Sequence, residues 1–339
     1  MTNRLVIINN ESISSNNQHF HCDNIDSKSL SEGLNKNFNV LMIGRLSKIQ
    51  RSHQINLKQI IAASNILVFL YNVLKTFKNK DSKYLLISIT PYTFLTYLVL
   101  LIFRKKIFVY LRSNGYEEYK YFLGFIGPAI YHAMFMIVSL KANLIGCRTH
   151  LLCGKTGKIV SPSQLNTKWF ESYQKPNLKK VALLYVGRLK VEKGIFSLLK
   201  IFNDLKIEAS LTVVSAGYNF IKKKINQKNV KIIDFKNEND SIIKIYDEHN
   251  IFILPSFTEA HPQVLDETLS RRRPVIVFEE ISHVIGNRKG IFVSKRDPVS
   301  LSKTINDIMN NYESIEKEIA KNTLPTKENF LKQMSDIMV

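Results

Sequence analysis

Short apolar runs alternate with stretches of helical periodicity through the second half of the chain, and this alternation most constrains the fold. The stretch after the first run places Ile195, Leu198 and Phe202 on one helical face. Strands that alternate with helices form a parallel sheet covered on both faces, because each crossover must return across the sheet. We therefore expect a doubly wound α/β fold. The predicted strands are 182–186, 211–214, 230–233, 251–254, 275–278 and 291–293.

The first half carries fewer strand signals and two long apolar runs. Its predicted strands are 40–43, 85–89, 107–111 and, more weakly, 144–145. The apolar runs are 92–103, which is followed by three basic residues, and 121–140. The first run is too short to span a membrane, and glycine and proline interrupt the second. Each is therefore either a buried crossover helix or an apolar surface that enters the headgroup layer of a bilayer.

The length of 339 residues is sufficient for two domains of ordinary size. Turn-rich segments around Ser161-Pro162-Ser163 and Lys175-Pro176-Asn177 predict the boundary between them. We expect an N-terminal domain over 1–170 and a second domain over 171–310. Residues 311–339 predict a helical tail, broken at Pro325, that carries no chemistry.

The chain is strongly basic, with a formal net charge of +20. Residues 1–170 hold 21 Lys and Arg against 7 Asp and Glu, whereas residues 171–339 hold 27 against 21. A basic first half favours nucleic acid, an anionic bilayer or phosphate-bearing substrates, and the alternative is a lysine-rich chain with solvated faces.

Cysteine and histidine usage predicts no metal site. The three cysteines form no CxxC pair, which indicates reduced thiols in the cytoplasm. His19-Phe20-His21-Cys22 lacks a second cluster with ligand spacing. The apolar run at the start of the chain is too short for a signal peptide, so nothing suggests export.

Two loops of the second half carry the residues that we expect to do chemistry. Gly187 to Gly194 leaves the first predicted strand and opens a helix, and glycine at both positions permits a sharp turn and a close backbone approach. Amides at a helix start bind anions, while Arg188 and Lys193 add a bidentate donor and a mobile charge. This loop therefore predicts a diphosphate site.

Glu259 and Glu267 follow a second strand, 251–254, at the same predicted sheet edge. Pro262 suits the first turn of a helix, so Glu259 is expected in the loop and Glu267 about one turn inside the helix. Ligands of open α/β sheets bind at this edge, and carboxylates are strong acceptors for sugar or ribose hydroxyls. Ordinary surface charge explains either loop alone, but the convergence of both favours a ligand site.

Four motifs of the second half resemble the donor domain of GT-B glycosyltransferases, most closely the retaining family 4 group with its E-x7-E element. They are Tyr185-Val-Gly-Arg-Leu-Lys-Val-Glu-Lys-Gly194, Leu254-Pro-Ser-Phe-Thr-Glu-Ala-His-Pro-Gln-Val-Leu-Asp-Glu-Thr-Leu269, Arg273-Pro-Val-Ile and Gly290-Ile-Phe-Val293. The resemblance covers roughly residues 180–310. It implies two Rossmann-like domains that face a central cleft.

The resemblance also implies residue roles. Gly187, Arg188 and Lys193 would hold the donor diphosphate. Glu259 would bind the hydroxyls of the transferred sugar, helped by backbone amides near His261, Pro262 and Gln263, and Glu267 would bind the ribose. Arg188, Lys193 and Glu259 are the candidate catalytic residues, because charge that develops on the leaving diphosphate is stabilised more in the transition state than in the ground state. No metal and no cofactor is expected.

The sequence departs from the family pattern at several places. Ala260 stands where relatives have glycine, and Arg271-Arg272-Arg273 stand where they have a small residue followed by glycine. The added bulk affects the expected shape of the donor pocket. The first half lacks the usual glycine-rich loop. Arg112-Ser113-Asn114-Gly115 stands where many relatives have a histidine-containing stretch, so Arg112 and Asn114 are the acceptor-side candidates, with a strand-end surface role as the alternative for Arg112.

The expected partners are a nucleotide-sugar donor, a saccharide or lipid-linked saccharide acceptor, and an anionic membrane surface. The expected function is transfer of a sugar during cell-surface polysaccharide or lipopolysaccharide assembly, peripheral to the inner face of the cell membrane. A nucleotide-sugar epimerase or a phosphorylase of the same fold is a weaker reading, as is a catalytically silent sugar-binding subunit. A basic nucleic-acid-binding protein is disfavoured because no helix-turn-helix or zinc module is evident, so no nucleic acid is expected as a partner.

Overall fold

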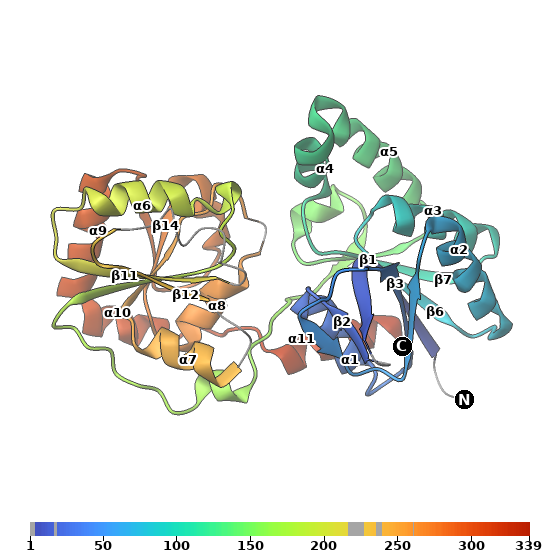
Figure 1. The fold of residues 1–339 in the computed structure, drawn as a ribbon, viewed down its shortest axis with the longest axis horizontal. Coiled ribbons are helices and arrows are strands. Elements are labelled where there is room, and N and C mark those ends of the chain that lie inside the picture. Colours follow the sequence, from blue (N-terminus) through green and yellow to red (C-terminus); the bar gives the residue numbers. More distant parts are fainter. Residues whose placement is uncertain (1–3, 17–18, 216–226, 235–238, 260) are drawn as a thin grey trace. The chain divides into compact units, whose positions relative to one another are not determined.

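A computed structural model describes residues 4–16, 19–215, 227–234, 239–259 and 261–339. The chain forms two compact units, one of Met1–Gln164 with Lys327–Val339 and one of Leu165–Thr326. Each unit contains its own sheet with helices on both faces (Figure 1).

The first unit is built on a parallel sheet in the order β5-β3-β1-β6-β7-β8-β9. Its strands are β1 (Arg4–Asn16), β2 (His19–Cys22), β3 (Asn39–Leu46), β4 (His53–Ile55), β5 (Gln59–Ala63), β6 (Lys83–Ile87), β7 (Lys106–Leu111), β8 (Asn143–Gly146) and β9 (Gly157–Ile159). Its helices are α1 (Ile25–Leu34), α2 (Ile66–Lys75), α3 (Pro91–Ile102), α4 (Gly115–Leu123), α5 (Gly127–Ser139) and α11 (Lys327–Met338). The short strands β2 and β4 add an antiparallel ribbon to the far end of β1.

The order of the first sheet reverses direction between β1 and β6. Successive strands β3 and β5 extend the sheet on one side of β1, and β6 to β9 extend it on the other. The carboxyl ends of β1 and β6 therefore form the switch point of this sheet, where ligands of doubly wound folds bind.

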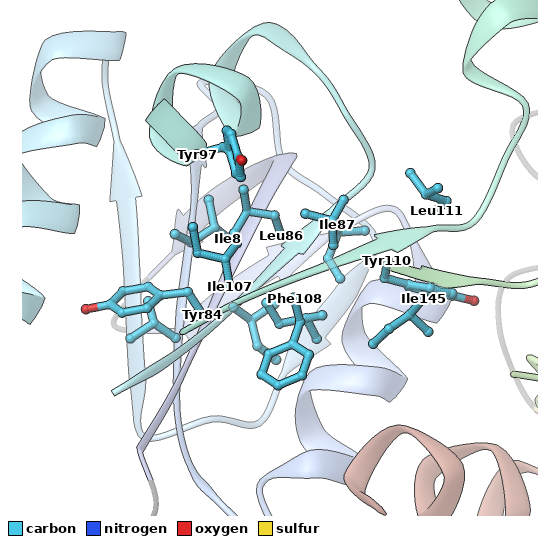
Figure 2. Packing of buried hydrophobic residues seen from close by; sticks show 14 of the residues in the cluster. Ile8, Tyr84, Leu86, Ile87, Tyr97, Ile107, Phe108, Tyr110, Leu111 and Ile145 are labelled. Atoms are coloured by element: carbon cyan, nitrogen blue, oxygen red, sulfur yellow. The ribbon is translucent and has the colours of Figure 1, made fainter. Parts of the chain in front are cut away.

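The core of the first unit lies on both faces of this sheet. Figure 2 shows Tyr97 of α3 on one face of the strands and Phe108 of β7 directed to the opposite face, as the alternation of side chains along a strand requires. Both side chains are buried.

The second unit repeats the same strand order, β12-β11-β10-β13-β14-β15, with all neighbours parallel. Its strands are β10 (Val181–Val186), β11 (Ala209–Ser215), β12 (Val230–Asp234), β13 (Ile251–Leu254), β14 (Val275–Phe278) and β15 (Ile291–Ser294). Its helices are α6 (Ile195–Asn203), α7 (Asn239–Asp247), α8 (Gln263–Ser270), α9 (Pro298–Asn310) and α10 (Tyr312–Ile319). The switch point lies between β10 and β13. All six strands predicted for this half are present, and the α/β fold class is confirmed.

The units differ from the predicted domains at both ends. The first unit ends at Gln164 rather than at residue 170, and residues 311–339 do not form a separate tail. Helix α10 packs in the second unit, whereas α11 returns to the first. The physical reason is an apolar stripe on α11, since Phe330, Met334 and Met338 are spaced four residues apart and are buried in the first core.

The apolar run predicted over 121–140 forms a helical hairpin. By length and composition alone, Gly115–Ser139 is the one described helical stretch that could cross a membrane, and 28% of its most apolar window is buried. The stretch is not straight, because Gly124 has φ +64° and ends α4. A side chain at Gly127 would place its Cβ 2.0 Å from the Tyr119 carbonyl oxygen. Helices α4 and α5 therefore pack closely against each other.

Candidate functional site

The switch point of the second sheet brings together the two loops that the sequence singled out. The loop after β10 supplies Lys193, and the loop after β13 supplies Glu259. Lys193 Nζ lies 2.6 Å from Glu259 Oε1, and the two side chains are only 21% and 10% exposed. The buried Ser256 hydroxyl donates to the same carboxylate oxygen at 2.7 Å. The structure thus places a cation and a carboxylate in contact at the edge where ligands bind.

Gly194 fixes how closely these loops approach. Its φ is +67°, and a Cβ at this position would lie 1.8 Å from the Pro255 carbonyl oxygen. The Phe257 N–H donates to the Glu192 carbonyl at 3.0 Å, and this hydrogen bond is a second contact between the loop after β10 and the loop after β13. We expected Gly194 to let a ligand approach the start of the helix. The group that approaches is instead the neighbouring loop, and glycine is required for that contact.

Gly187 also acts differently from the expectation. Its φ is not in the left-handed region, so it is not required for a sharp turn. A Cβ at Gly187 would lie 2.7 Å from the Tyr185 hydroxyl, and that hydroxyl donates to the Arg188 carbonyl at 2.8 Å. Gly187 therefore leaves room for the bond that shapes the loop. Burial, and then the charge of Glu259, raise the pKa of Tyr185, so its phenol stays protonated and remains a donor.

Arg188 lies exposed on the same loop, and among the described residues it makes no ion pair. Its guanidinium is therefore available to an anion in solution. Helix α6 begins directly after Gly194, and Gly194 provides no side-chain cap. The amides of the first turn of a helix are an anion site when no side chain satisfies them. These features agree with the predicted diphosphate site, whose ligand role stays a prediction.

Glu267 lies one turn inside α8, as predicted, and is half-buried. Its Oε2 accepts a hydrogen bond from the Tyr246 hydroxyl at 2.8 Å. Burial, with Glu267 as a further cause, raises the pKa of Tyr246, so that phenol also remains a donor. Pro262 is the buried residue that precedes α8, and half-buried His261 and Gln263 flank it. Ala260 lies outside the described residues.

Sequence reasoning missed two side chains that support this site. Arg296 follows β15 and donates to the carbonyl oxygens of Pro255 and Ser256 at 2.9 and 3.2 Å. His283 Nε2 lies 2.9 Å from the Glu259 carbonyl oxygen, which can only accept, so this nitrogen donates. Arg296 could have been suspected, because a cation at the carboxyl end of a third strand faces the same sheet edge; His283 gave no signal.

The arginines predicted to add bulk to the donor pocket are directed elsewhere. Arg271 is 1% exposed and pairs with Asp247 at 2.8 Å, at the end of α7. Its guanidinium also donates to the carbonyl oxygens of Trp169, Glu171 and Ser172. Arg273, equally buried, binds the carbonyls of residues 174, 247, 249 and 271. Both side chains hold the segment 169–174, so the expected effect of their bulk on the shape of the donor pocket stays a prediction that these contacts do not support.

The two acceptor-side candidates lie in the first unit and have different surroundings. Asn114 caps α4, and its Oδ1 accepts from the Tyr116 N–H at 3.2 Å. Arg112 is half-buried, and its Nη1 lies 3.5 Å from the Ser27 hydroxyl of α1. Burial raises the pKa of the neighbouring Glu11, and the charge of Arg112 opposes this shift. Their binding roles stay predictions.

No group of three or more His, Cys, Asp or Glu side chains is placed to hold a metal ion within the described ranges. Cys22 and Cys147 are buried and Cys153 is exposed. Burial raises the pKa of Cys22 to about 12 and that of Cys147 to about 11, so both thiols stay protonated at neutral pH.

Comparison with known proteins finds relatives both by sequence and by fold. The chain is 30% identical over 124 residues to a protein of Bacillus subtilis assigned to teichuronic acid biosynthesis as the glycosyltransferase TuaC, covering 36% of this chain and 31% of that one. It is 26% identical over 180 residues to the capsular polysaccharide biosynthesis glycosyltransferase CapM of Staphylococcus aureus, covering 48% and 46%. The matches thus span less than half the length of these curated relatives. The structure of Anabaena HepE in complex with UDP-glucose aligns with a TM-score of 0.68 at 10% identity, covering 98% of both chains.

Two Rossmann-like units, the second with a cation and a carboxylate at its switch point, define a protein of the GT-B fold. Residues 166–324 match the model of glycosyl transferases group 1. This region, just under half of the chain, is similar to the group 1 glycosyltransferases.

Proposed function

We propose that the chain is a retaining glycosyltransferase that moves a sugar from a nucleotide-sugar donor to a saccharide acceptor, which is lipid-linked, in cell-surface polysaccharide or lipopolysaccharide assembly. The observation that carries the proposal is the contact between Lys193 and Glu259 at the switch point of the second sheet. The named roles of TuaC and CapM favour the same substrate class.

The proposed chemistry uses the groups around this contact. As the bond between the sugar C1 and the diphosphate oxygen breaks, negative charge grows on the diphosphate. Lys193, Arg188 and the start of α6 stabilise that charge. The acceptor oxygen bonds to C1 on the same face, and its proton leaves with the nucleotide diphosphate. We propose that no metal ion is needed, because these positive groups replace it.

Glu259 has a positioning role in this proposal. Its Oε1 receives both Lys193 and Ser256, so the carboxylate is oriented before a donor arrives. The acceptor capacity that remains on a carboxylate suits two sugar hydroxyls. Glu267, oriented by Tyr246, would accept from the ribose hydroxyls. Glu259→Gln is therefore expected to change the preference among sugars, whereas Glu267→Gln is expected to weaken all donors with the same nucleoside alike.

Two lysines of the loop after β10 allow the catalytic role of Lys193 to be tested. Lys193→Ala removes the cation at the switch point, and Lys190→Ala removes an exposed one that lies 3.7 Å from Glu192. Loss of one preorganised charge from the transition state costs about 100-fold in rate. We expect kcat/KM to fall by about that factor in the first variant and to change less than about twofold in the second. Equal rates in both variants would refute the role of Lys193.

The donor is identified by a binding screen. A ligand at a hundred times its Kd stabilises the native state by about 2.7 kcal/mol, which thermal unfolding resolves. UDP, GDP and ADP are compared, with UDP as the first nucleotide because the HepE complex contains UDP-glucose. If no nucleotide raises Tm in the wild type, the donor site is refuted. A nucleotide that binds without any transfer or donor hydrolysis would identify a silent sugar-binding subunit instead.

We further propose that the turn between α4 and α5 binds an anionic membrane surface. Side chains at this turn are apolar and exposed, with Tyr121 at 78%, Phe122 at 74% and Phe125 at 91%. Ile102 and Phe103 at the end of α3 are exposed as well, and Arg104 to Lys106 follow them. Aromatic residues beside basic ones are typical of surfaces that enter the headgroup layer and attract anionic lipid.

Vesicle flotation tests this surface. Burial of one phenylalanine side chain is worth about 2 kcal/mol, so Phe125→Ser should lower partitioning to phosphatidylglycerol vesicles by roughly 30-fold. Val299→Ser is the matched control, because Val299 is 74% exposed on α9 of the other unit. Binding that is insensitive to both substitutions would show that this turn does not contact lipid.

A further inference from the structure

The first unit contains a cavity that the proposed donor chemistry does not use. It encloses about 280 Å³ at the carboxyl ends of β7 and β8. Its lining includes Ser113, Asn114, Tyr116, Tyr131, His150 and Cys153. Ligand cavities in proteins begin at about 300 Å³, so this volume suits one monosaccharide unit rather than an oligosaccharide.

Aromatic side chains form a rigid wall of this cavity. The rings of Tyr116 and Tyr131 meet edge to face with their centroids 4.8 Å apart. Gly115 makes this packing possible, since a Cβ there would lie 2.0 Å from the Tyr131 ring. The Tyr116 hydroxyl lies 2.9 Å from His132 Nδ1. Burial, and then Cys153, raise the pKa of Tyr116 to about 12, so the phenol stays protonated at neutral pH.

A second, smaller void adjoins the cavity and shares Ser113, Gly115 and Tyr131 with it. Ser88 lines this void directly after β6, at the switch point of the first sheet. Its φ is +61°, and its hydroxyl oxygen is buried with no hydrogen-bond partner among the described residues. The void has no room for a water molecule, so Ser88 marks strain in the wall beside the cavity and is not a group that a ligand contacts.

The charge around the cavity selects the ligand. The described residues that line it offer hydroxyl, amide, imidazole and thiol groups and include no Lys or Arg, and Glu118 lines the adjoining void. An anion placed here would find no cationic partner and would face a carboxylate. A neutral, hydroxyl-rich ring would find donors, acceptors and an aromatic face.

We propose that this cavity binds the accepting unit of the acceptor, a neutral hexose, with the Tyr116 hydroxyl as its hydrogen-bonding anchor. The inference rests on the proposed function for the meaning of the ligand, because that function requires a saccharide acceptor. The existence of the sugar site itself does not depend on it. Ser113 and His150, which also line the cavity, complete the hydroxyl contacts.

Cys153 offers a direct reporter of occupancy. It lines the cavity and is the exposed thiol of three, while Cys22 and Cys147 are buried. Alkylation by N-ethylmaleimide in the full-length protein should therefore modify Cys153 first. Glucose, galactose and N-acetylglucosamine are tested for protection without any donor, with glucuronic acid as the anionic comparison and glycerol as the control. About 12 heavy atoms give an expected Kd on the order of millimolar.

The expected result is that at least one neutral hexose slows alkylation several-fold at concentrations up to ~100 mM, well above that Kd. Tyr116→Phe should weaken this protection about tenfold, which corresponds to one hydrogen bond in a site built for a hydroxyl. Tyr121→Phe is the matched control on the same helix, because Tyr121 lies at the exposed turn. It should leave protection unchanged.

Two results would overturn the inference. One is alkylation that no neutral hexose slows more than glycerol does, and the other is protection by glucuronic acid but by no neutral hexose. Equal loss of protection in the Tyr116 and Tyr121 variants would remove Tyr116 as the anchor. The labelling needs no turnover. Protection without sugar transfer therefore leaves this site standing and refutes the proposed function, and transfer without protection does the reverse.

Discussion

Gly194→Ala tests whether the two loops of the donor site depend on their close backbone contact. The added methyl group would lie 1.8 Å from the Pro255 carbonyl oxygen, about half of an ordinary carbon–oxygen contact. It would also meet the Arg296 guanidinium at 3.2 Å. The loops must therefore separate, and this breaks the alignment of Lys193 with Glu259.

The magnitude follows from two separable costs. A non-glycine residue at φ +67° costs about 1 kcal/mol of conformational strain. Forcing the loops apart adds about 1–3 kcal/mol, as overpacking does in a close-packed site. Gly286→Ala is the matched control in the same unit, because Gly286 has φ +57° and nothing lies within 4 Å of its added Cβ. The Gly286→Ala variant therefore measures the conformational strain without the steric clash.

Urea denaturation gives the free energy of unfolding of both variants, and calorimetry gives nucleotide affinity. We expect Gly194→Ala to lose about 2–4 kcal/mol and Gly286→Ala about 1 kcal/mol. Only the first should lose nucleotide affinity. If the two variants agree within about 0.5 kcal/mol and both bind nucleotide normally, the contact with Pro255 does not organise the site, and the reasoning is refuted.

Two further perturbations address stability. Arg271→Met removes the nearer of the two buried arginines that pair with Asp247, together with the donors to three carbonyl oxygens, and should cost about 3–5 kcal/mol in urea denaturation. Arg272→Met, at an exposed position, should cost less than about 1 kcal/mol, and equal costs would contradict the structural role of Arg271. Burial raises the pKa of Glu11 above 4.5, so the native state binds a proton more tightly than the unfolded state and loses stability as pH rises through the folded pKa. Glu11→Gln removes this loss, so the free energy of unfolding of the variant should exceed that of the wild type above pH 4.5, by an amount that grows towards neutrality. A difference that does not change with pH would count against this reasoning.

The second half of the chain was predictable because its strands are buried on both faces. Such strands are continuous apolar runs, so 251–254 and 275–278 match β13 and β14 residue for residue. Strand β1 escaped prediction since polar residues interrupt it. Its pairing with β3 shifts register between Ile8 and Ser12, and this bulge carries Asn9, Asn10 and Glu11 through the middle of the strand. A polar segment inside a strand cannot be distinguished from a loop by periodicity.

Side-chain direction was the other limit of the sequence. Arg271 and Arg273 are placed correctly after α8, but a long side chain reaches several ångströms in any direction, and composition does not select one. The structure shows that both guanidiniums satisfy carbonyl oxygens of the segment 169–174 and that Asp247 balances their charge. The two buried arginines therefore have a structural role, because they hold the segment 169–174 in place. Their bulk is then no argument against a donor pocket.

The first unit shows why topology adds to motif reading. No glycine-rich loop follows β1, so a search for phosphate motifs finds nothing there. The strand order nevertheless places a switch point between β1 and β6, as it does between β10 and β13. In the second unit, charged side chains lie at the switch point, and charged residues can be recognised in a sequence. In the first unit, the strained Ser88 lies at the switch point, beside the aromatic cavity. Neither backbone strain nor an unsatisfied hydroxyl can be recognised in a sequence. The proposed neutral ligand would lie beside the first switch point, at the carboxyl ends of β7 and β8, and the proposed anionic ligand would lie at the second switch point.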